Sequence, residues 1–407
     1  MISRRILSVL GGFVALTSLP RAVQSPGMVV HEWGTFTTVA GKDGVAVDWL
    51  PLGGRDDLPC FVEHFNDRAP LQLKGVTGAA LNGIPDYATA RANLIGKVRM
   101  ETPVLYFYSE QPARVSVHVD FPQGLMTEWF PKATVAQRQM NTASLRSVNG
   151  TTWMRWDSVN VVPQSAAHFP KGDEPSHYYQ ARATDATPLA VGTQAEKFLF
   201  YRGVANFDVP LTATVFGDES IRVSNRGKDA IPVVIAFTNR GGKIGYRVER
   251  NVSGSVTIPA PLLDRDVATL RQELASILAG EGLFAKEATA MVETWRDTWF
   301  EEGTRVFYVF PRATVDAVLP VTIWPKPANM ARVFVGRMDV ITPAMERDVA
   351  AAFKVNDATT LAKYGRVLGP IADRVLADTP LPAERAAISR ILNSVLAAQA
   401  RGGTVCP

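Results

Sequence analysis

Alternating apolar and polar positions predict β-strands in the first part of the chain. In Arg114–Phe121, apolar residues occupy every second position and polar residues lie between them, as expected for a strand with one buried face. Val104–Tyr108 is predicted to be its partner strand, joined to it by the turn Ser109–Ala113. The pair Asn149-Gly150 predicts a tight hairpin turn before a strand over Thr151–Trp156.

The strand pattern continues to about residue 258. Glycine-containing turns at Asn225–Gly227 and Asn239–Gly242 separate short strands, because Asn and Gly tolerate positive φ. Short strands at regular spacing favour an antiparallel, sandwich-like β region over residues 28–258. Its further predicted strands are Phe198–Arg202, Leu211–Phe216, Ile221–Ser224, Val233–Phe237 and Ile244–Val248.

After residue 258 the apolar residues change to helical spacing. One helix is predicted from Val267 to Leu278, a second from Phe284 to Trp299, a third beginning at Thr342-Pro343 and a last beginning near Pro382. Two strands are predicted between the second and third helices, over Arg305–Phe310 and Arg332–Val340. The sequence therefore predicts an α+β fold, with a mixed, mostly α-helical region over residues 259–407 packed on the β region.

Composition places the chain among globular proteins. Of its 407 residues, 46% are hydrophobic and 20% are charged, enough for a large core and for two domains or subdomains. The sequence has no stripe of Lys and Arg and no basic-aromatic module, so we expect no nucleic-acid partner.

Residues 1–27 are typical of an export signal. Arg4 and Arg5 precede an apolar stretch, Ile6–Leu19, which has the length of a secretory signal core and is short for a membrane span of about 20 residues. Cleavage is expected between Pro20 and Met28. We therefore expect a periplasmic or extracellular protein with no transmembrane span after the signal.

The export route stays open. The double arginine resembles a twin-arginine signal, and an ordinary secretory signal with a basic start fits equally well. Removing the three arginines at positions 4, 5 and 21, the only charged residues of the segment, lowers the net charge from +4 to +1. An uncleaved membrane anchor is a further, less favoured alternative.

The only two cysteines, Cys60 and Cys406, predict a disulfide bond in an oxidising compartment. This bond would close a loop of nearly the whole mature chain. The alternative is two unrelated free thiols.

Histidines are the first candidates for chemistry. The chain contains no zinc-protease, nucleophile-elbow or phosphate-loop motif. His31, His64 and His177, together with a neighbouring carboxylate such as Glu32 or Glu63, would suit zinc or another divalent transition metal if the fold brought them together. The alternative is that each histidine makes local hydrogen bonds within the β region.

The segment His31–Thr37 is rich in aromatic and β-branched residues. Trp33 and Phe36 would lie on opposite faces of a strand, and Gly34 suggests a bulge or a close approach of another chain segment. We favour a buried strand near the centre of a sheet over the wall of a binding pocket.

A pair of carboxylates is the second candidate. Glu293 and Asp297 are four residues apart, on one face of the predicted helix, with Arg296 beside them. Such a pair could supply a general acid and a general base. A solvent-exposed helix face with an arginine counter-ion is the more favoured alternative.

Four segments together resemble a family of uncharacterised exported bacterial proteins. They are His31–Thr37, Asp57–Val62, Met100–Tyr108 and Glu293–Gly303. The resemblance covers most of the mature chain. It implies export and brings no activity, cofactor or site residue.

Two hypotheses for function follow from the sequence. The first is an exported binding or structural module for a glycan, a peptide or an envelope protein. The second is a secreted hydrolase, which depends either on a metal held by the histidines or on Glu293 and Asp297.

Overall fold

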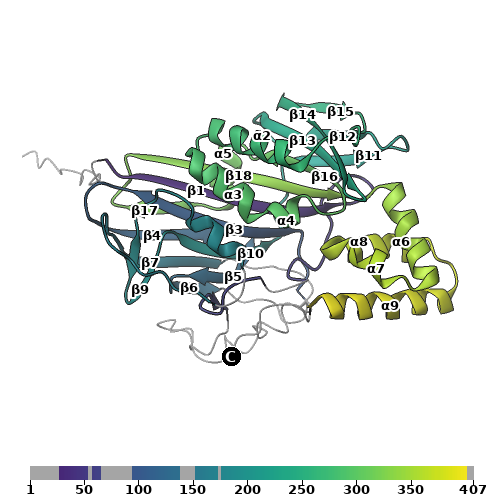
Figure 1. The fold of residues 1–407 in the computed structure, drawn as a ribbon, viewed down its shortest axis with the longest axis horizontal. Helices are drawn as coiled ribbons and strands as arrows, with labels where there is room; N and C mark the ends of the chain where they lie inside the picture. Colours follow the sequence, from purple (N-terminus) through teal and green to yellow (C-terminus); the bar gives the residue numbers. More distant parts are fainter. Residues whose placement is uncertain (1–26, 54–56, 66–93, 138–151, 173–175, 401–407) are drawn as a thin grey trace, which may run out of the picture.

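A nine-stranded mixed sheet forms the centre of an α+β fold, which confirms the expected fold class (Figure 1). The computed structural model describes residues 27–53, 57–65, 94–137, 152–172 and 176–400. In spatial order the strands are β14 (Lys243–Val252), β13 (Ile231–Arg240), β16 (Gly303–Val309), β18 (Asn329–Val340), β1 (Val29–Ala40), β3 (Val98–Tyr108), β10 (Leu199–Ala205), β5 (Gly124–Phe130) and β2 (Glu63–His64).

Two smaller sheets pack on one face of this central sheet. A shared apolar core joins Phe36 and Tyr201 of the central sheet to Val117 and Trp156 of the first small sheet and Val223 of the second, an arrangement compatible with a β-sandwich. The first comprises β17 (Val321–Trp324), β4 (Ala113–Phe121), β7 (Thr152–Val161), β8 (Leu189–Val191), β9 (Gln194–Glu196) and β6 (Thr134–Gln137). The second comprises β11 (Leu211–Val215), β12 (Ile221–Asn225) and β15 (Ser255–Ile258).

Helices cover the other face and one end of the central sheet (Figure 1). The face carries η3 (His177–Arg182), α2 (Val267–Gly280), α3 (Ala285–Thr294) and α4 (Arg296–Trp299). The end carries α6 (Pro343–Val355), α7 (Ala358–Ala362), η4 (Gly365–Val367), α8 (Leu368–Ala377) and α9 (Pro382–Ala400), while α5 (Arg312–Val318) links β16 to β17. None of the helices within these ranges is both long and apolar enough to span a membrane.

The predicted partner of the strand Arg114–Phe121 is wrong. β4 pairs with β7 and β17, whereas β3, which contains Val104–Tyr108, pairs with β1 and β10 in the central sheet. The turn between β3 and β4 therefore crosses from one layer to the other. The physical reason is burial, because β3 is buried on both faces and β4 alternates.

One sheet runs across the expected domain boundary at residue 258. β16 and β18, from the region expected to be mostly helical, lie between β13 and β1 in the central sheet. β1 pairs with β18 in parallel, so the sheet is mixed rather than purely antiparallel. The sheet's core is thus built from both ends of the described chain.

The favoured interpretation of His31–Thr37 is confirmed. β1 is the fifth of the nine strands, and Trp33 and Phe36 enter the cores on opposite faces. Gly34 lies at a register shift between β1 and β3, and a Cβ atom there would lie 2.7 Å from the ring of Phe334. Glycine at this position therefore leaves room for the ring of Phe334.

Three sequence predictions fall partly or wholly outside the described residues. The export signal lies there apart from residue 27, and so does the Asn149-Gly150 turn. The structure describes Cys60 but not Cys406, so the expected disulfide stays a prediction. Elsewhere, Thr342 caps α6 as expected, because its side chain accepts a hydrogen bond from the backbone N–H of Met345.

Gly336→Ala should destabilise the protein by about 3 kcal/mol, because overpacking a core forces its neighbours to move. A Cβ atom at Gly336 would lie 2.2 Å from the ring of buried Tyr308. Gly369→Ala is the matched control, since a Cβ atom there meets nothing within 4 Å in α8. The control should be neutral or stabilising by up to about 1 kcal/mol. Equal unfolding free energies for the two variants in urea titrations would contradict the packing argument.

Candidate functional site

Charged and polar side chains form a row across the helix-covered face of the central sheet. Directly paired residues on neighbouring strands share a face, and the pairs run Arg305–Asp339, Arg337–Thr37–Arg99, Thr35–Glu101 and Arg202–Glu128. We call these nine residues the charged row: Arg305 of β16, Arg337 and Asp339 of β18, Thr35 and Thr37 of β1, Arg99 and Glu101 of β3, Arg202 of β10 and Glu128 of β5.

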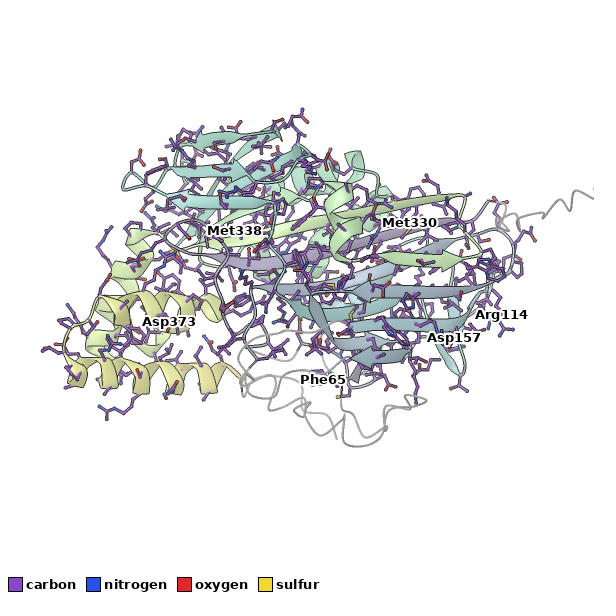
Figure 2. All side chains as sticks on the ribbon, turned by 180° about the vertical axis from the view of Figure 1, so that it is seen from behind. Phe65, Arg114, Asp157, Met330, Met338 and Asp373 are labelled. Carbon is purple, nitrogen blue, oxygen red and sulfur yellow. The ribbon has the colours of Figure 1, made fainter. Side chains whose placement is uncertain are left out.

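The charged row occupies one end of the sheet. In Figure 2, Met330 and Met338 mark the two ends of β18, and the Met338 end lies nearer the helix that carries Asp373. Arg337 and Asp339 are the residues on either side of Met338 in the sequence. The apolar half of the same face lies under α2 and α3. The charged half is instead covered by the segments that carry Asp57, Glu301 and Arg366.

All members of the charged row are buried. Arg305 and Arg337 are each 1% exposed and Glu101 and Asp339 each 2%. Such residues are almost never fully buried without a partner, because removing a charge from water is costly. Each buried charge of the row is therefore expected to have a partner of opposite charge nearby.

Asp339 and the covering residue Glu301 balance the two arginines on β16 and β18. Asp339 accepts a hydrogen bond from Arg305 at 2.9 Å and two from Arg337 at 3.1 Å. Arg337 also donates to Glu301 at 2.6 Å, and Arg305 donates to the backbone carbonyls of Trp299, Glu301 and Glu302. Burial opposes ionisation of Asp339, but Arg337 and Arg305 hold its pKa below the usual range.

The half on β3 and β10 contains three guanidinium groups. Arg202 donates to both carboxylate oxygens of Asp57, at 2.8 and 3.3 Å. Arg366 donates to Glu101 Oε1 at 2.8 Å. Arg99 lies 3.8 Å from the same oxygen and donates one hydrogen bond, to the backbone carbonyl of Pro51 at 2.6 Å.

Charges of both signs surround Arg99. Burial lowers the pKa of Arg99 to about 10; Glu101 and Asp57 oppose this effect, and Arg366 and Arg202 add to it. Burial alone would raise the pKa of Glu101, but Arg366 and Arg99 bring it down to about 2. Glu101 is therefore ionised at neutral pH beside the buried guanidinium group of Arg99.

Two threonine hydroxyls in the row have no hydrogen-bond partner among the described residues. Thr35 and Thr37 are each 1% exposed, and their Oγ1 atoms make no hydrogen bond to any residue that the structure describes. They lie opposite Glu101 and Arg99 on the neighbouring strand. Leaving buried hydroxyls unpaired costs free energy.

Thr102, next to Glu101, is backbone-strained. Its φ is 47°, in the left-handed region that a β-branched residue rarely adopts. Its hydroxyl accepts weak hydrogen bonds from Arg202 at 3.4 Å. Strain of this kind persists where surrounding structure imposes it, and it clusters at functional sites.

Four segments singled out in the sequence, His31–Thr37, Asp57–Val62, Met100–Tyr108 and Glu293–Gly303, meet at the charged row. They contribute Thr35 and Thr37, then Asp57, then Glu101, and finally Glu301. They are far apart in sequence, and the fold brings them to one end of one sheet face.

His31 is not part of the charged row. It lies at the other end of β1, where its Nδ1 atom is 2.7 Å from Glu287 Oε2. Glu287 also accepts hydrogen bonds from the Tyr108 hydroxyl at 2.7 Å and from the backbone N–H of Phe284 at 2.8 Å. Burial and the nearby Glu287 raise the pKa of Tyr108 well above its usual value. The cluster thus ties β1 and β3 to α3.

The three predicted metal-binding histidines have different surroundings. His31 pairs with Glu287, His64 lies opposite Glu128 at the sheet edge, and His177 lies 3.7 Å from Asp297. Within the described ranges, no group of three or more His, Cys, Asp or Glu side chains is placed to hold a metal ion. The transition-metal hypothesis stays a prediction without a described site.

Glu293 and Asp297 lie on separate helices, because the predicted helix is interrupted at Trp295. Glu293 pairs with Arg271 of α2 and with Arg296 at 3.7 Å, and Asp297 lies 3.5 Å from Arg296. Asp297 is 61% exposed. This is the arrangement expected of a solvated helix surface with arginine counter-ions.

Sequence reasoning missed the charged row, although a signal was present. Arg99-x-Glu101 and Arg337-x-Asp339 each place two charges, two residues apart, inside otherwise apolar strand segments. Charges on one face of a strand that is buried on both faces indicate a buried polar site. The partners on distant strands could not be read from this pattern.

Neither a protein-family model nor a curated protein sequence matches this chain. The site is therefore interpreted from its own geometry.

Stability should fall as the pH drops from about 4.5 towards 2. Glu101 has an ordinary pKa of 4.5 and a folded pKa of about 2, so the unfolded chain binds more protons within this window and acid favours unfolding. The burial of Asp57 opposes ionisation, but Arg202 still lowers its pKa and adds to the effect.

Urea unfolding at pH 7, 4.5 and 3 measures this dependence. Glu101→Gln should cost about 3–5 kcal/mol at pH 7, because it leaves buried arginines unpaired, and should weaken the loss of stability at low pH. Glu384→Gln, at an exposed position in α9, is the control. Parallel pH profiles for wild type and Glu101→Gln would refute the assignment.

Proposed function

We propose that this chain is a binding protein for a small oxyanion, or for the anionic group of a larger molecule, held at the charged row. The observation that carries the proposal is the pair of buried, unpartnered hydroxyls of Thr35 and Thr37 beside Arg99. It is a specific form of the binding-module hypothesis drawn from the sequence.

The donors of the site favour an anion as the ligand. Arg99 donates a hydrogen bond to the backbone carbonyl of Pro51 and lies 3.8 Å from Glu101 Oε1, beyond hydrogen-bond distance. An anion beside Arg99 would accept hydrogen bonds from its other N–H groups. Hydrogen bonds from guanidinium and hydroxyl groups to a charged oxygen are among the stronger ones in proteins.

The residues that cover the row are partly exposed to solvent. The side chains of Asp57, Glu301 and Arg366 are 27%, 25% and 14% exposed, whereas the strand residues beneath them are buried. A ligand would approach between these side chains and meet Arg99 and the threonines below. Such preformed donors reduce the cost of ordering the site on binding.

Acid–base catalysis by the carboxylates of the row is less well supported. A general acid must hold a proton near the working pH. The pKa of Glu101 is about 2, and those of Asp57 and Asp339 are also lowered against the effect of burial. Binding is therefore the better proposal than carboxylate-dependent hydrolysis at this site.

Export remains part of the proposal and rests on the pattern of residues 1–27. An exported binding protein would meet its ligand outside the cytoplasm. Oxidising conditions there would also favour the bond between Cys60 and Cys406.

Arg99→Gln should weaken binding of sulfate or phosphate by about 10- to 100-fold, because it removes a charged donor. Without ligand it should change stability by no more than about 1 kcal/mol, since burial already disfavours the cation. Isothermal titration calorimetry at constant ionic strength measures the affinity. Unchanged affinity in Arg99→Gln would remove Arg99 from the site, and the absence of anion binding by wild type would end the proposal.

Thr37→Val and Thr38→Val form a matched pair. Both threonines are buried with unpartnered hydroxyls, but they point to opposite faces of β1. Both variants should raise the unfolding free energy without ligand by up to about 1 kcal/mol. Only Thr37→Val should weaken anion binding, by about tenfold or more. Equal affinities in the two variants would show that the row's hydroxyls do not touch the ligand.

A further inference from the structure

Glu101 adds an acceptor to a site that otherwise offers donors. Its Oε1 atom accepts a hydrogen bond from Arg366. With a pKa of about 2, the carboxylate is ionised at neutral pH and can only accept hydrogen bonds.

This acceptor lies among the donors of the proposed site. Thr35 is paired directly with Glu101, and Thr37 with Arg99, two positions along the same strands. Arg99 Nε is 3.8 Å from Glu101 Oε1. An anion bound by Arg99 and the threonine hydroxyls would therefore lie close to a carboxylate.

A fully deprotonated anion would be repelled there. Sulfate carries no proton at neutral pH, so it would place a charged oxygen against Glu101, and close like charges cost several kcal/mol. Inorganic phosphate differs because it keeps at least one O–H group at neutral pH. That group can donate a hydrogen bond to Glu101, while the remaining oxygens accept from Arg99 and the threonines.

We infer that the ligand of the charged row is a protonated tetrahedral oxyanion, inorganic phosphate in its hydrogenphosphate and dihydrogenphosphate forms, and that Glu101 selects it over sulfate. This inference rests on the proposed anion-binding function. It assigns Thr35, Thr37 and Arg99 as hydrogen-bond donors to the ligand. Glu101 is the acceptor that distinguishes a protonated oxyanion from one without a proton.

The same chemistry separates free phosphate from phosphate esters. A phosphate monoester loses its last proton with a pKa near 6, so methyl phosphate carries the required O–H group at pH 5 and lacks it at pH 8. Dimethyl phosphate carries an anionic charge but no O–H group at either pH.

Isothermal titration calorimetry on the full-length protein, with ionic strength held constant, tests the inference at pH 5 and pH 8. Inorganic phosphate and arsenate should bind at both values, about 100-fold or more tighter than sulfate. Methyl phosphate should bind at pH 5 and weaken at least tenfold at pH 8. Dimethyl phosphate should not bind at either pH.

The outcomes separate the two claims. Equal affinities for phosphate and sulfate would overturn the role of Glu101 and leave the anion-binding function standing. No binding of any anion would overturn the function itself. Binding of methyl phosphate at pH 8 with the affinity of inorganic phosphate would also overturn the requirement for a proton.

Glu101→Gln provides an independent arm. The amide can donate a hydrogen bond, so the ratio of phosphate to sulfate affinity should fall at least tenfold. An unchanged ratio in the folded variant would contradict the inference. If the variant does not fold, the wild-type comparison among the anions still decides the question.

Discussion

Burying arginine and carboxylate side chains on one face of the central sheet fixes the register of its strands. A slip of one residue would turn Arg337 and Asp339 from the charged row into the apolar core around Met338. Each unpaired charge would then cost several kcal/mol. The constraint is strongest for β1 and β18, whose residues Glu32 and Arg332 pair across 300 positions of sequence.

The same constraint divides the helix-covered face into two halves. The apolar half, with Trp33 and Val335, can be covered by the apolar sides of α2 and α3. The charged half needs partners that carry charge or free carbonyl groups, and it receives Glu301, Arg366 and the end of α4. The C-terminal helices are thus held against the sheet by charge as well as by their own apolar cluster.

Local patterns were read correctly from the sequence, and distant partners were not. The alternation in Arg114–Phe121 identified β4, and helical spacing from Val267 identified α2. The partner of β4 was wrong because local pattern carries no information on which of several apolar strands lies alongside. The parallel pairing of β1 with β18 was not predicted for the same reason, since no short connection links these strands.

The candidate site shows the same limit at the level of single residues. Glu293 and Asp297 stood out because their spacing suggested one helix face, yet Arg271 on another helix neutralises Glu293. His31 was predicted as a metal ligand, yet its Nδ1 atom is hydrogen-bonded to Glu287, which lies 256 residues away in the sequence. Arg99 and Glu101 were not predicted as site residues from the sequence. A charged residue in a strand indicates a buried polar site only once both faces of that strand are known to be buried.

The charged row lowers the folding stability that this end of the sheet could otherwise provide. Well-packed apolar residues often replace buried ion pairs without loss of stability, and this row adds a strained Thr102 and two unpaired hydroxyls to the cost. Strain of this type amounts to about 1–3 kcal/mol. Burial disfavours the charge of Arg99. The proposed ligand, which accepts hydrogen bonds from Arg99, Thr35 and Thr37, would offset the cost of burying these three donors, because each of them would be a contact in the complex.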